Sequence, residues 1–381
     1  MKHAALALAL VLTAAPAYAQ LGGLGRGLKK ATDAKEKVDK VRDLFISEAD
    51  ERKIGEQVSD KVRVEFGVFQ NQAVTKYVTM VGTVMTQASS RPDLKWEFIV
   101  LDTDGVNAFA SPGGLVHITR GALGLTKSEA ELAGVLAHEI AHITKKHTVN
   151  AIKKNKSVQF AADVAPGSNE YIAGIANAAY ENIVEKGFDR GDEEDADQEG
   201  IRMANKAGYN PSGLGTFLTK LADRNKDQTN ERNGLFASHP ETKGRIDKLT
   251  RQIKAEKLNA SATVQPRYAS QITFDVPALS EIATVVPGTR GVAGSTAKPG
   301  STSEKAEPKA EEKEKPKRGF GLGSLNLSKG KQAESTQANA SAGNRAVGRD
   351  RAAKGGDNPS KVRVPALTPS ELQAFIKGIA G

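Results

Sequence analysis

The chain has 381 residues, with 54 Lys and Arg against 45 Asp and Glu, a formal net charge of +9 and no cysteine. The lack of cysteine excludes a disulfide framework and argues against a lipid-modified N-terminal cysteine. No stripe of basic residues alternates with aromatic ones, so no nucleic-acid partner is expected.

The N-terminus has the pattern of an exported protein. Residues 1–19 combine a basic start, a short apolar run and the small-residue site Ala17-Tyr18-Ala19, which predicts a signal peptide cleaved before Gln20. A membrane anchor is the alternative, but it needs about 20 apolar residues. No other run is that long, so the mature chain is expected to have no transmembrane segment. We expect export to the periplasm of a Gram-negative bacterium, where the basic charge allows peripheral contact with a membrane.

Residues 47–258 predict one mainly helical α+β domain, which follows an N-terminal segment at 20–46. A helix is expected to begin at Ser47, and a second one to span about 74–85. The runs "KWEFIVLD" and "GLVHIT", at 95–102 and 114–119, predict strands. Thr126-Lys127-Ser128-Glu129 has the pattern of a capping box, which predicts a buried helix from there through His147.

This buried helix carries the pattern His-Glu-x-x-His. His138 and His142 lie one turn apart on one face, so both imidazoles can bind one metal ion. Glu139 projects about 100° around the helix axis from His138, where it can act as a general base on water. A solvated helix face is the alternative, but burying three unpaired polar groups on an otherwise apolar helix costs several kcal/mol. The pattern therefore predicts one catalytic Zn²⁺ per chain, with His138 and His142 as ligands.

The acidic segment "FDRGDEEDADQEG", at 188–200, is the candidate source of a third ligand. Glu193 and Asp197 are four residues apart and share a face of a helix. One of them can bind the metal while the other accepts the second N–H of a ligand histidine. By itself the segment is also compatible with a solvated face. His147 is interpreted as a structural or surface histidine.

Four ordered motifs carry a family resemblance: "NAFASPGGLVHITRGAL", "ELAGVLAHEIAHITKKH", "RGDEEDAD" and "SHPETKGRI". They resemble the zinc metallopeptidases that include the CAAX prenyl endopeptidases, the HtpX heat-shock protease and the periplasmic quality-control protease BepA. The resemblance covers residues 47–258 and implies a gluzincin-type core, in which two histidines from one helix and a glutamate from a later helix bind zinc. The family's Arg-x-x-Glu-x-x-Ala-Asp element matches Arg190, Glu193, Ala196 and Asp197. This match makes Glu193 the third ligand and places Arg190 and Asp197 behind the ligands.

The resemblance also implies further roles. It places "SHPET" near the site, where His239 or Arg245 could stabilise an oxyanion, or where His239 could approach the metal in a resting state. Strand 115–119 could offer an edge to an extended substrate, and Asn107 and Ala108 could hold the substrate backbone.

The expected function is that of a zinc-dependent endopeptidase of the cell envelope. Its expected substrates are proteins or peptides, in particular misfolded or envelope proteins, and envelope-assembly or outer-membrane proteins are candidate partners. The alternative is a latent or non-proteolytic, chaperone-like binding factor of the periplasm, with the Ala-rich segment 171–184 as a lid over the cleft.

The composition changes after residue 258. An extension at 259–290 precedes a stretch at 291–361 that is poor in aromatic and branched apolar residues, which predicts a disordered linker. Residues 362–381 then predict a short amphipathic helix, with Thr368 and Glu371 as a capping box. Its apolar stripe is Leu372, Phe375, Ile376 and Ile379. So short a helix is marginal alone, so we expect it to dock on its own domain, on a partner or on a membrane surface.

Overall fold

The computed structural model describes residues 46–154, 164–165, 167–225, 239, 242–278, 281–282, 359–361 and 366–380. The predicted signal peptide, the segment that follows it up to residue 45 and almost all of the predicted linker lie outside these described residues. Within these ranges, no helix combines the length and the apolar character needed to cross a membrane.

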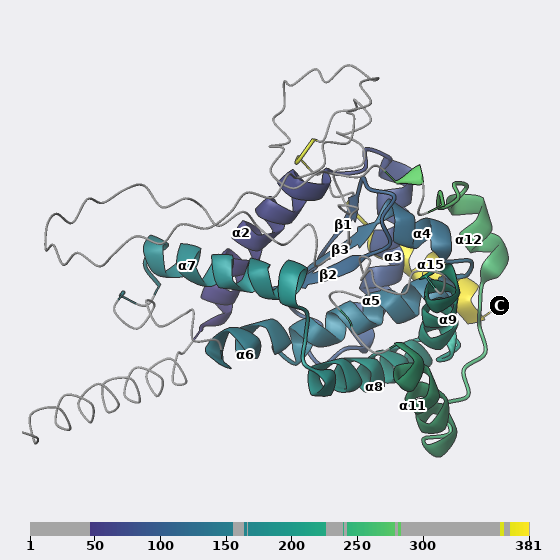
Figure 1. Cartoon of the computed structure of the whole chain (residues 1–381). Helices are drawn as coiled ribbons and strands as arrows, with labels where there is room; N and C mark the ends of the chain where they lie inside the picture. The colour runs from purple at the N-terminus through teal and green to yellow at the C-terminus, as the bar shows by residue number, and fades with distance from the viewer. Residues whose placement is uncertain are drawn as a thin grey trace, which may run out of the picture.

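The described chain is mainly helical with one small mixed sheet, which confirms the predicted fold class (Figure 1). The elements are α2 (Glu48–Phe66), α3 (Gln72–Ala88), β1 (Glu97–Leu101), β2 (Ala108–Ser111), β3 (Leu115–Thr119), α4 (Arg120–Leu125), α5 (Glu129–Thr144), α6 (His147–Lys154), α7 (Asn169–Tyr180), the π-helix η2 (Glu181–Lys186), α8 (Arg190–Lys206), α9 (Gly213–Asn225), α11 (Thr242–Ala255), α12 (Gln265–Gln271) and α15 (Pro369–Ala380). The two N-terminal helices and the two predicted strands lie where the sequence places them.

The sheet has the strand order β1-β3-β2, with β1 parallel and β2 antiparallel to β3. Gly113 and Gly114 have φ values of 72° and 100°, which only glycine adopts without strain, and they form the tight turn from β2 into β3. The strand β2 was not predicted. Because β3 lies between two partners, the expectation that residues 115–119 offer a free edge is wrong, and the outer strand on this side is β2.

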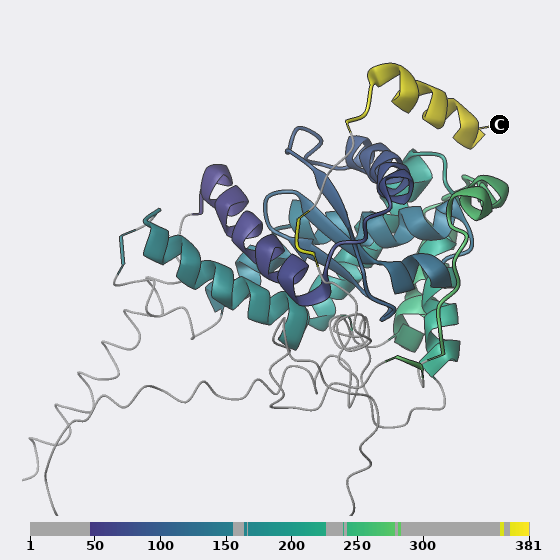
Figure 2. The ribbon, with the colours of Figure 1, turned by 90° about the horizontal axis from the view of Figure 1, so that it is seen from above.

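Side chains alternate across the sheet and build a core on each face. Phe98, Val100 and Val116 pack with α3 and α5, whereas Ile99, Leu101 and Phe109 pack with α2 and α7. Figure 2 shows the sheet between these two groups of helices. The helix α5 is therefore held directly under the sheet.

The helix α5 begins later and ends earlier than predicted. Its N-cap is Ser128, whose hydroxyl accepts from the Glu131 N–H, while the Glu131 carboxylate accepts from the Lys127 N–H. The capping box therefore lies two residues beyond the predicted one, and Thr126 instead caps the end of α4. The chain leaves the helix at Lys146, which has a φ of 58°, so His147 starts the separate helix α6.

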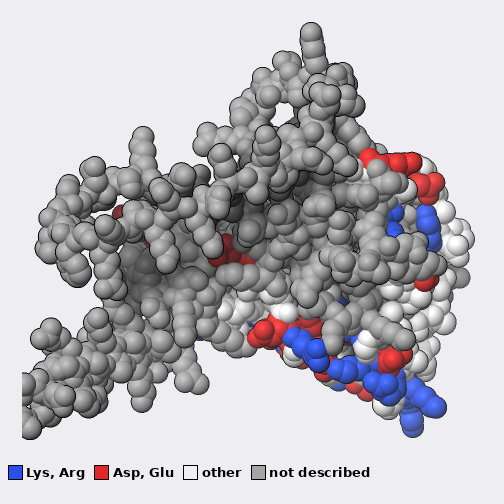
Figure 3. All heavy atoms as spheres, in the orientation of Figure 1, with Lys and Arg blue, Asp and Glu red and all other residues white. Residues whose placement is uncertain are grey.

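The helix α8 runs alongside α5, and a glycine permits their close approach. A Cβ on Gly200 would lie 3.2 Å from the backbone nitrogen of His138. On the face drawn in Figure 3, acidic and basic side chains mingle over α8 and α11, where Lys248 pairs with Glu194 and Arg202 with Glu256. These contacts fix α8 against both α5 and α11.

The C-terminal helix α15 packs on its own domain rather than standing alone. Thr368 and Glu371 form the capping box, since the Thr368 hydroxyl accepts from the Glu371 N–H and the carboxylate accepts from the Thr368 N–H. Phe375 and Ile379 are buried in the core beside α3. The Arg267 guanidinium lies 4.0 Å from the Phe375 ring centroid, and it also pairs with the buried Glu129 at the start of α5. The C-terminal helix thus reaches the first turn of α5 through one arginine.

We expect Phe375→Ala to lower the free energy of unfolding by about 2–3 kcal/mol. This loss is smaller than for a phenylalanine enclosed in the core on all sides, because α15 can detach from the domain and so limits the loss. Chemical denaturation would measure the change. Gln373→Ala, on the exposed side of the same helix, is the matched control and should change stability by less than about 0.5 kcal/mol. Equal stabilities of the two variants would show that α15 contributes nothing by docking.

Candidate metal centre

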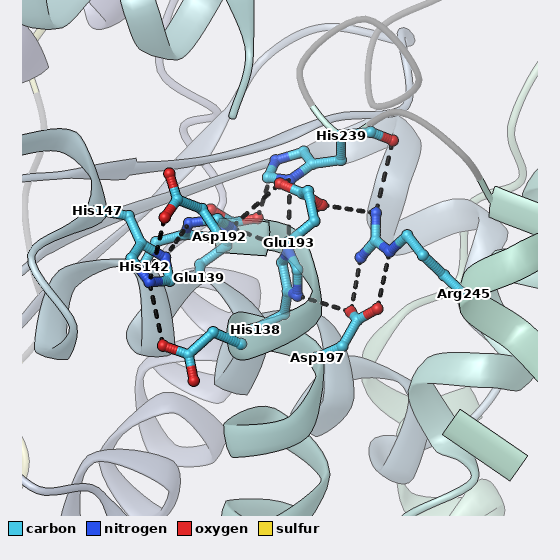
Figure 4. Close-up of polar contacts among 10 residues, drawn as sticks. His138, Glu139, His142, His147, Asp192, Glu193, Asp197, His239 and Arg245 are labelled. Carbon is cyan, nitrogen blue, oxygen red and sulfur yellow. Dashed lines mark hydrogen bonds and ion pairs between the residues drawn. The ribbon is translucent and has the colours of Figure 1, made fainter. Parts of the chain in front are cut away.

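The two histidines of α5 point their Nε2 atoms toward one point inside the protein (Figure 4). His138 Nε2 and His142 Nε2 are 3.0 Å apart, and both side chains are buried. Their convergence follows from the four-residue spacing on a helix, as predicted.

The opposite side of this point is formed by α8 and by the segment before α11. Glu193, in the first turn of α8, lies 3.4 Å from His142 Nε2 through Oε1 and 3.6 Å from His138 Nε2 through Oε2. His239 Nδ1 lies 2.8 Å from Glu193 Oε1 and 3.2 Å from His138 Nε2. One ligand atom from each of these four buried residues lies within 4.8 Å of all the others.

The spacing of these four ligand atoms fits a metal ion with tetrahedral coordination. Zinc–ligand distances near 2.0–2.1 Å separate neighbouring ligand atoms by about 3.3 Å, close to the distances between these four side chains. His138 Nδ1 faces a carboxylate, so this histidine can keep its proton on Nδ1 and direct the lone pair of Nε2 at a metal ion. An ion bound by all four ligand atoms would satisfy buried polar groups that otherwise face only one another.

Behind the ligands, Asp197 and Arg245 hold the arrangement in place. Asp197 Oδ1 lies 3.0 Å from His138 Nδ1, on the side of the ring away from the other ligand atoms, where a carboxylate orients a ligand histidine. Burial by itself would raise the pKa of Asp197, but the charge of Arg245 and its hydrogen bonds outweigh burial and hold this pKa at about 2. Asp197 therefore stays ionised and fixes the orientation of the His138 ring.

Arg245, on α11, is buried and lies against both carboxylates of α8. Its Nε and Nη2 donate to Asp197 at 2.8 and 2.6 Å, and Nη1 lies 2.7 Å from Glu193 Oε2. Burial would raise the pKa of Glu193, but the charges of His239 and Arg245 hold it well below its usual range. These contacts favour a role for Arg245 in positioning Glu193 and Asp197 over the predicted role as an oxyanion donor. Arg190 is exposed at the first residue of α8, and Arg245 supplies the guanidinium behind the ligands.

The carboxylate of Glu139 lies beside the four ligand residues. The side chain is buried, and neither oxygen has a hydrogen-bond partner within the described part of the chain. His239 Nε2 is 3.5 Å from Oε1. Burial raises the pKa of Glu139, as a base that must accept and release a proton near neutral pH requires.

The predicted substrate-binding residues lie at the start of β2. Asn107 is buried, and its side-chain oxygen accepts from the Ala108 N–H at 2.9 Å. The Asn107 backbone is tied to Thr119 at the end of β3. Asn107 thus holds the backbone at Ala108, the first residue of the outer strand β2. The role of Asn107 and Ala108 in binding a substrate stays a prediction.

Two residues next to His142 were not predicted as part of the site. Phe188 stacks on the His142 ring with centroids 3.9 Å apart and planes at 20°. His147 is buried, with Nδ1 3.0 Å from His142 Nδ1, so it is a structural histidine. Phe188 is the first residue of the acidic segment 188–200, and this position near Glu193 was the one signal that could have placed it here.

Comparisons with known proteins agree with this geometry. The model of the family described as peptidase family M48 matches residues 72–253. The chain is 24% identical over 256 residues to the beta-barrel assembly-enhancing protease of Yersinia pestis, covering 64% of this chain and 52% of that protein. It is 28% identical over 202 residues to the mitochondrial metalloendopeptidase OMA1 of Schizosaccharomyces pombe, covering 52% and 60%. For the metalloprotease YcaL of Escherichia coli K12 the identity is 26% over 160 residues, covering 41% and 61%.

The chain spans about half of the length of the first of these relatives. The matched range contains α5 and α8 and ends within α11, so it includes every residue of the candidate metal centre. Residues 72–253 therefore form a domain of peptidase family M48, as the resemblance implied.

Proposed function

We propose that this protein is a zinc-dependent endopeptidase. The observation that carries the proposal is the buried group of His138, His142, Glu193 and His239. Beside it lies the carboxylate of Glu139, which has no hydrogen-bond partner within the described residues. A group of this kind within an M48 domain supports hydrolysis of peptide bonds. Mixed nitrogen and oxygen ligands in a tetrahedral arrangement favour zinc over magnesium or calcium, which prefer six or more oxygen ligands.

Each residue has a role in the proposed reaction. When bound, the zinc ion polarises the peptide carbonyl and lowers the pKa of a coordinated water to about 7. Glu139 takes the proton from the attacking water and passes it to the leaving amine. Asp197 keeps the proton of His138 on Nδ1, and Arg245 holds Glu193 in place.

The outer edge of β2 is the proposed binding surface for the substrate. Within the described residues β2 pairs only with β3, and it contacts α5 and η2. An extended peptide can add to such an edge through backbone hydrogen bonds, which would bring its carbonyl groups past α5. Asn107 and Ala108 would set the start of that edge.

Removal of a ligand tests the metal site. We expect His138→Ala, His142→Ala and Glu193→Ala each to bind less than one zinc ion per chain. Because metal binding adds to the free energy of folding, each variant should also lose the increase in melting temperature that zinc causes in the wild type. Elemental analysis and thermal melts with and without a chelator would measure both. Glu194→Ala, next in sequence but paired with Lys248 at the surface, is the control. Full zinc content in Glu193→Ala would refute the third ligand.

We also propose export to the periplasm and a role in quality control of envelope proteins. The sequence of residues 1–19 supports export, and mass spectrometry of the mature N-terminus would test cleavage before Gln20. The printed name of the Yersinia pestis relative refers to β-barrel assembly, which supports envelope or outer-membrane proteins as substrates or partners. Accumulation of envelope proteins in cells that carry only Glu139→Gln would support this role, and an unchanged envelope proteome would contradict it.

A latent, binding-only form is the second candidate, and His239 supports it. Its Nδ1 lies among the ligand atoms of the other three residues, at the position that an attacking water would need. In this arrangement His239 must leave before peptide hydrolysis, and a protein in which it stays would bind unfolded chains without cutting them.

A further inference from the structure

The two histidines of α5 differ in what lies behind them. His138 Nδ1 faces the Asp197 carboxylate at 3.0 Å, whereas His142 Nδ1 faces another histidine, His147 Nδ1, at 3.0 Å. His147 Nε2 in turn lies 3.3 Å from Asp195 Oδ2 on α8. Figure 4 shows His147 next to His142 on the side away from Glu193.

In the series His142, His147 and Asp195, the position of each proton follows once His142 Nε2 is directed at the metal position. A neutral imidazole carries its proton on one nitrogen only. With Nε2 as the lone pair, His142 carries its proton on Nδ1 and donates it to His147 Nδ1. His147 then has its own proton on Nε2, which it donates to the Asp195 carboxylate. Every nitrogen has one role, and the three residues permit only this assignment.

The local backbone explains why a histidine five residues later can reach back. On a continuous helix, residues five apart lie about 140° apart around the axis and do not meet. Here α5 ends at Thr144, and Lys146 has a left-handed φ of 58°. This turn directs His147 back onto His142, while Phe188 covers the His142 ring from its face. Stacking fixes the ring plane, and the contact with His147 fixes which nitrogen points to the metal.

We propose that His147 is a positioning residue for the metal centre: it accepts the Nδ1 proton of His142 and, anchored by Asp195, holds His142 Nε2 on the metal. The proposal rests on the proposed zinc site. It assigns the two ligand histidines different supports, a buried carboxylate for His138 and a neutral imidazole for His142. Partners of this kind typically contribute 10–100-fold to metal affinity.

Two substitutions separate hydrogen bonding from packing. His147→Leu fills the space without an acceptor, and we expect it to weaken zinc binding about 10–100-fold. His147→Asn places an amide oxygen near the position of Nδ1, so it can still accept from His142, and we expect a loss of less than about threefold. Asp195→Ala should fall between them, because His147 keeps its acceptor but loses its anchor. Asn150→Ala is the matched control, since Asn150 is exposed on the same short helix α6.

The experiment is competition for zinc between the full-length protein and a chromogenic chelator, together with thermal melts of the metal-free variants. The expected order of zinc affinity is wild type, then Asn, then Leu, with similar melting temperatures of the metal-free proteins. Equal affinities of the Leu and Asn variants would overturn the proposal and leave a packing role. So would a Leu variant whose zinc affinity matches that of wild type. A wild-type protein that binds no zinc would refute the metal site itself, and this proposal with it.

Discussion

Replacing Glu139 by glutamine should reduce kcat for cleavage of an unfolded protein by about 10²–10⁴-fold while zinc content stays at one ion per chain. The amide keeps the size of the side chain, so packing around the buried position is preserved, but it cannot accept a proton from water. The carboxylate of Glu139 has no hydrogen-bond partner in the described structure, so few other interactions are lost. Steady-state proteolysis and elemental analysis of the same preparation would measure both quantities.

The control for this experiment is Glu194→Gln, a surface position on α8 that pairs with Lys248 and should leave kcat unchanged. Wild-type turnover in Glu139→Gln would refute the general base. A wild-type protein that retains unfolded chains but never cuts them would instead favour the binding-only form. In that case His239→Ala, which removes the side chain from the ligand group, should release activity if His239 is what closes the site.

Arg245→Ala should lower the free energy of unfolding of the metal-free protein by about 3–5 kcal/mol. The change leaves the buried carboxylates of Glu193 and Asp197 without the cation that contacts both, and an uncompensated buried charge is costly. Denaturant titration in the presence of a chelator would measure the loss apart from any effect on zinc. Arg202→Ala is the matched control, because Arg202 makes a two-pronged contact with Glu256 at 2.8 and 2.6 Å but at the surface. It should cost at most about 1 kcal/mol.

The effect of Arg245 should also depend on pH. The pKa of Asp197 is depressed from 3.8 to about 2, so its contribution to stability is present above pH 3.8 and is lost as the pH falls toward 2. Arg245→Ala removes the main cause of this depression. The stability difference between wild type and Arg245→Ala should therefore shrink between pH 4 and pH 2. A difference that stays constant over this range would contradict the linkage to Asp197.

The sequence determined those parts of the site that depend on local geometry. His138, Glu139 and His142 could be placed because the spacing of residues along a helix follows from its 3.6-residue turn alone. The same holds for the capping box of Thr368 and Glu371 and for the apolar stripe that α15 buries. Composition and strand-like runs predicted the mainly helical α+β class, because they report how much of each element can be buried.

How distant segments of the chain meet depends on the packing of the whole domain. The sequence left Glu193 and Asp197 equivalent until the resemblance separated them. In the structure the packing of α8 on α5 brings Glu193 to the Nε2 atoms and Asp197 to His138 Nδ1. The central place of β3, the contact of Arg245 with both carboxylates and the return of His147 onto His142 were not predictable in the same way. The place of β3 depends on strand pairing, and the return of His147 depends on the left-handed turn at Lys146. The contact of Arg245 with Asp197 joins residues 48 positions apart in the chain. Such contacts form only when the whole domain packs, because no local pattern of side chains encodes the distance between segments far apart in the chain.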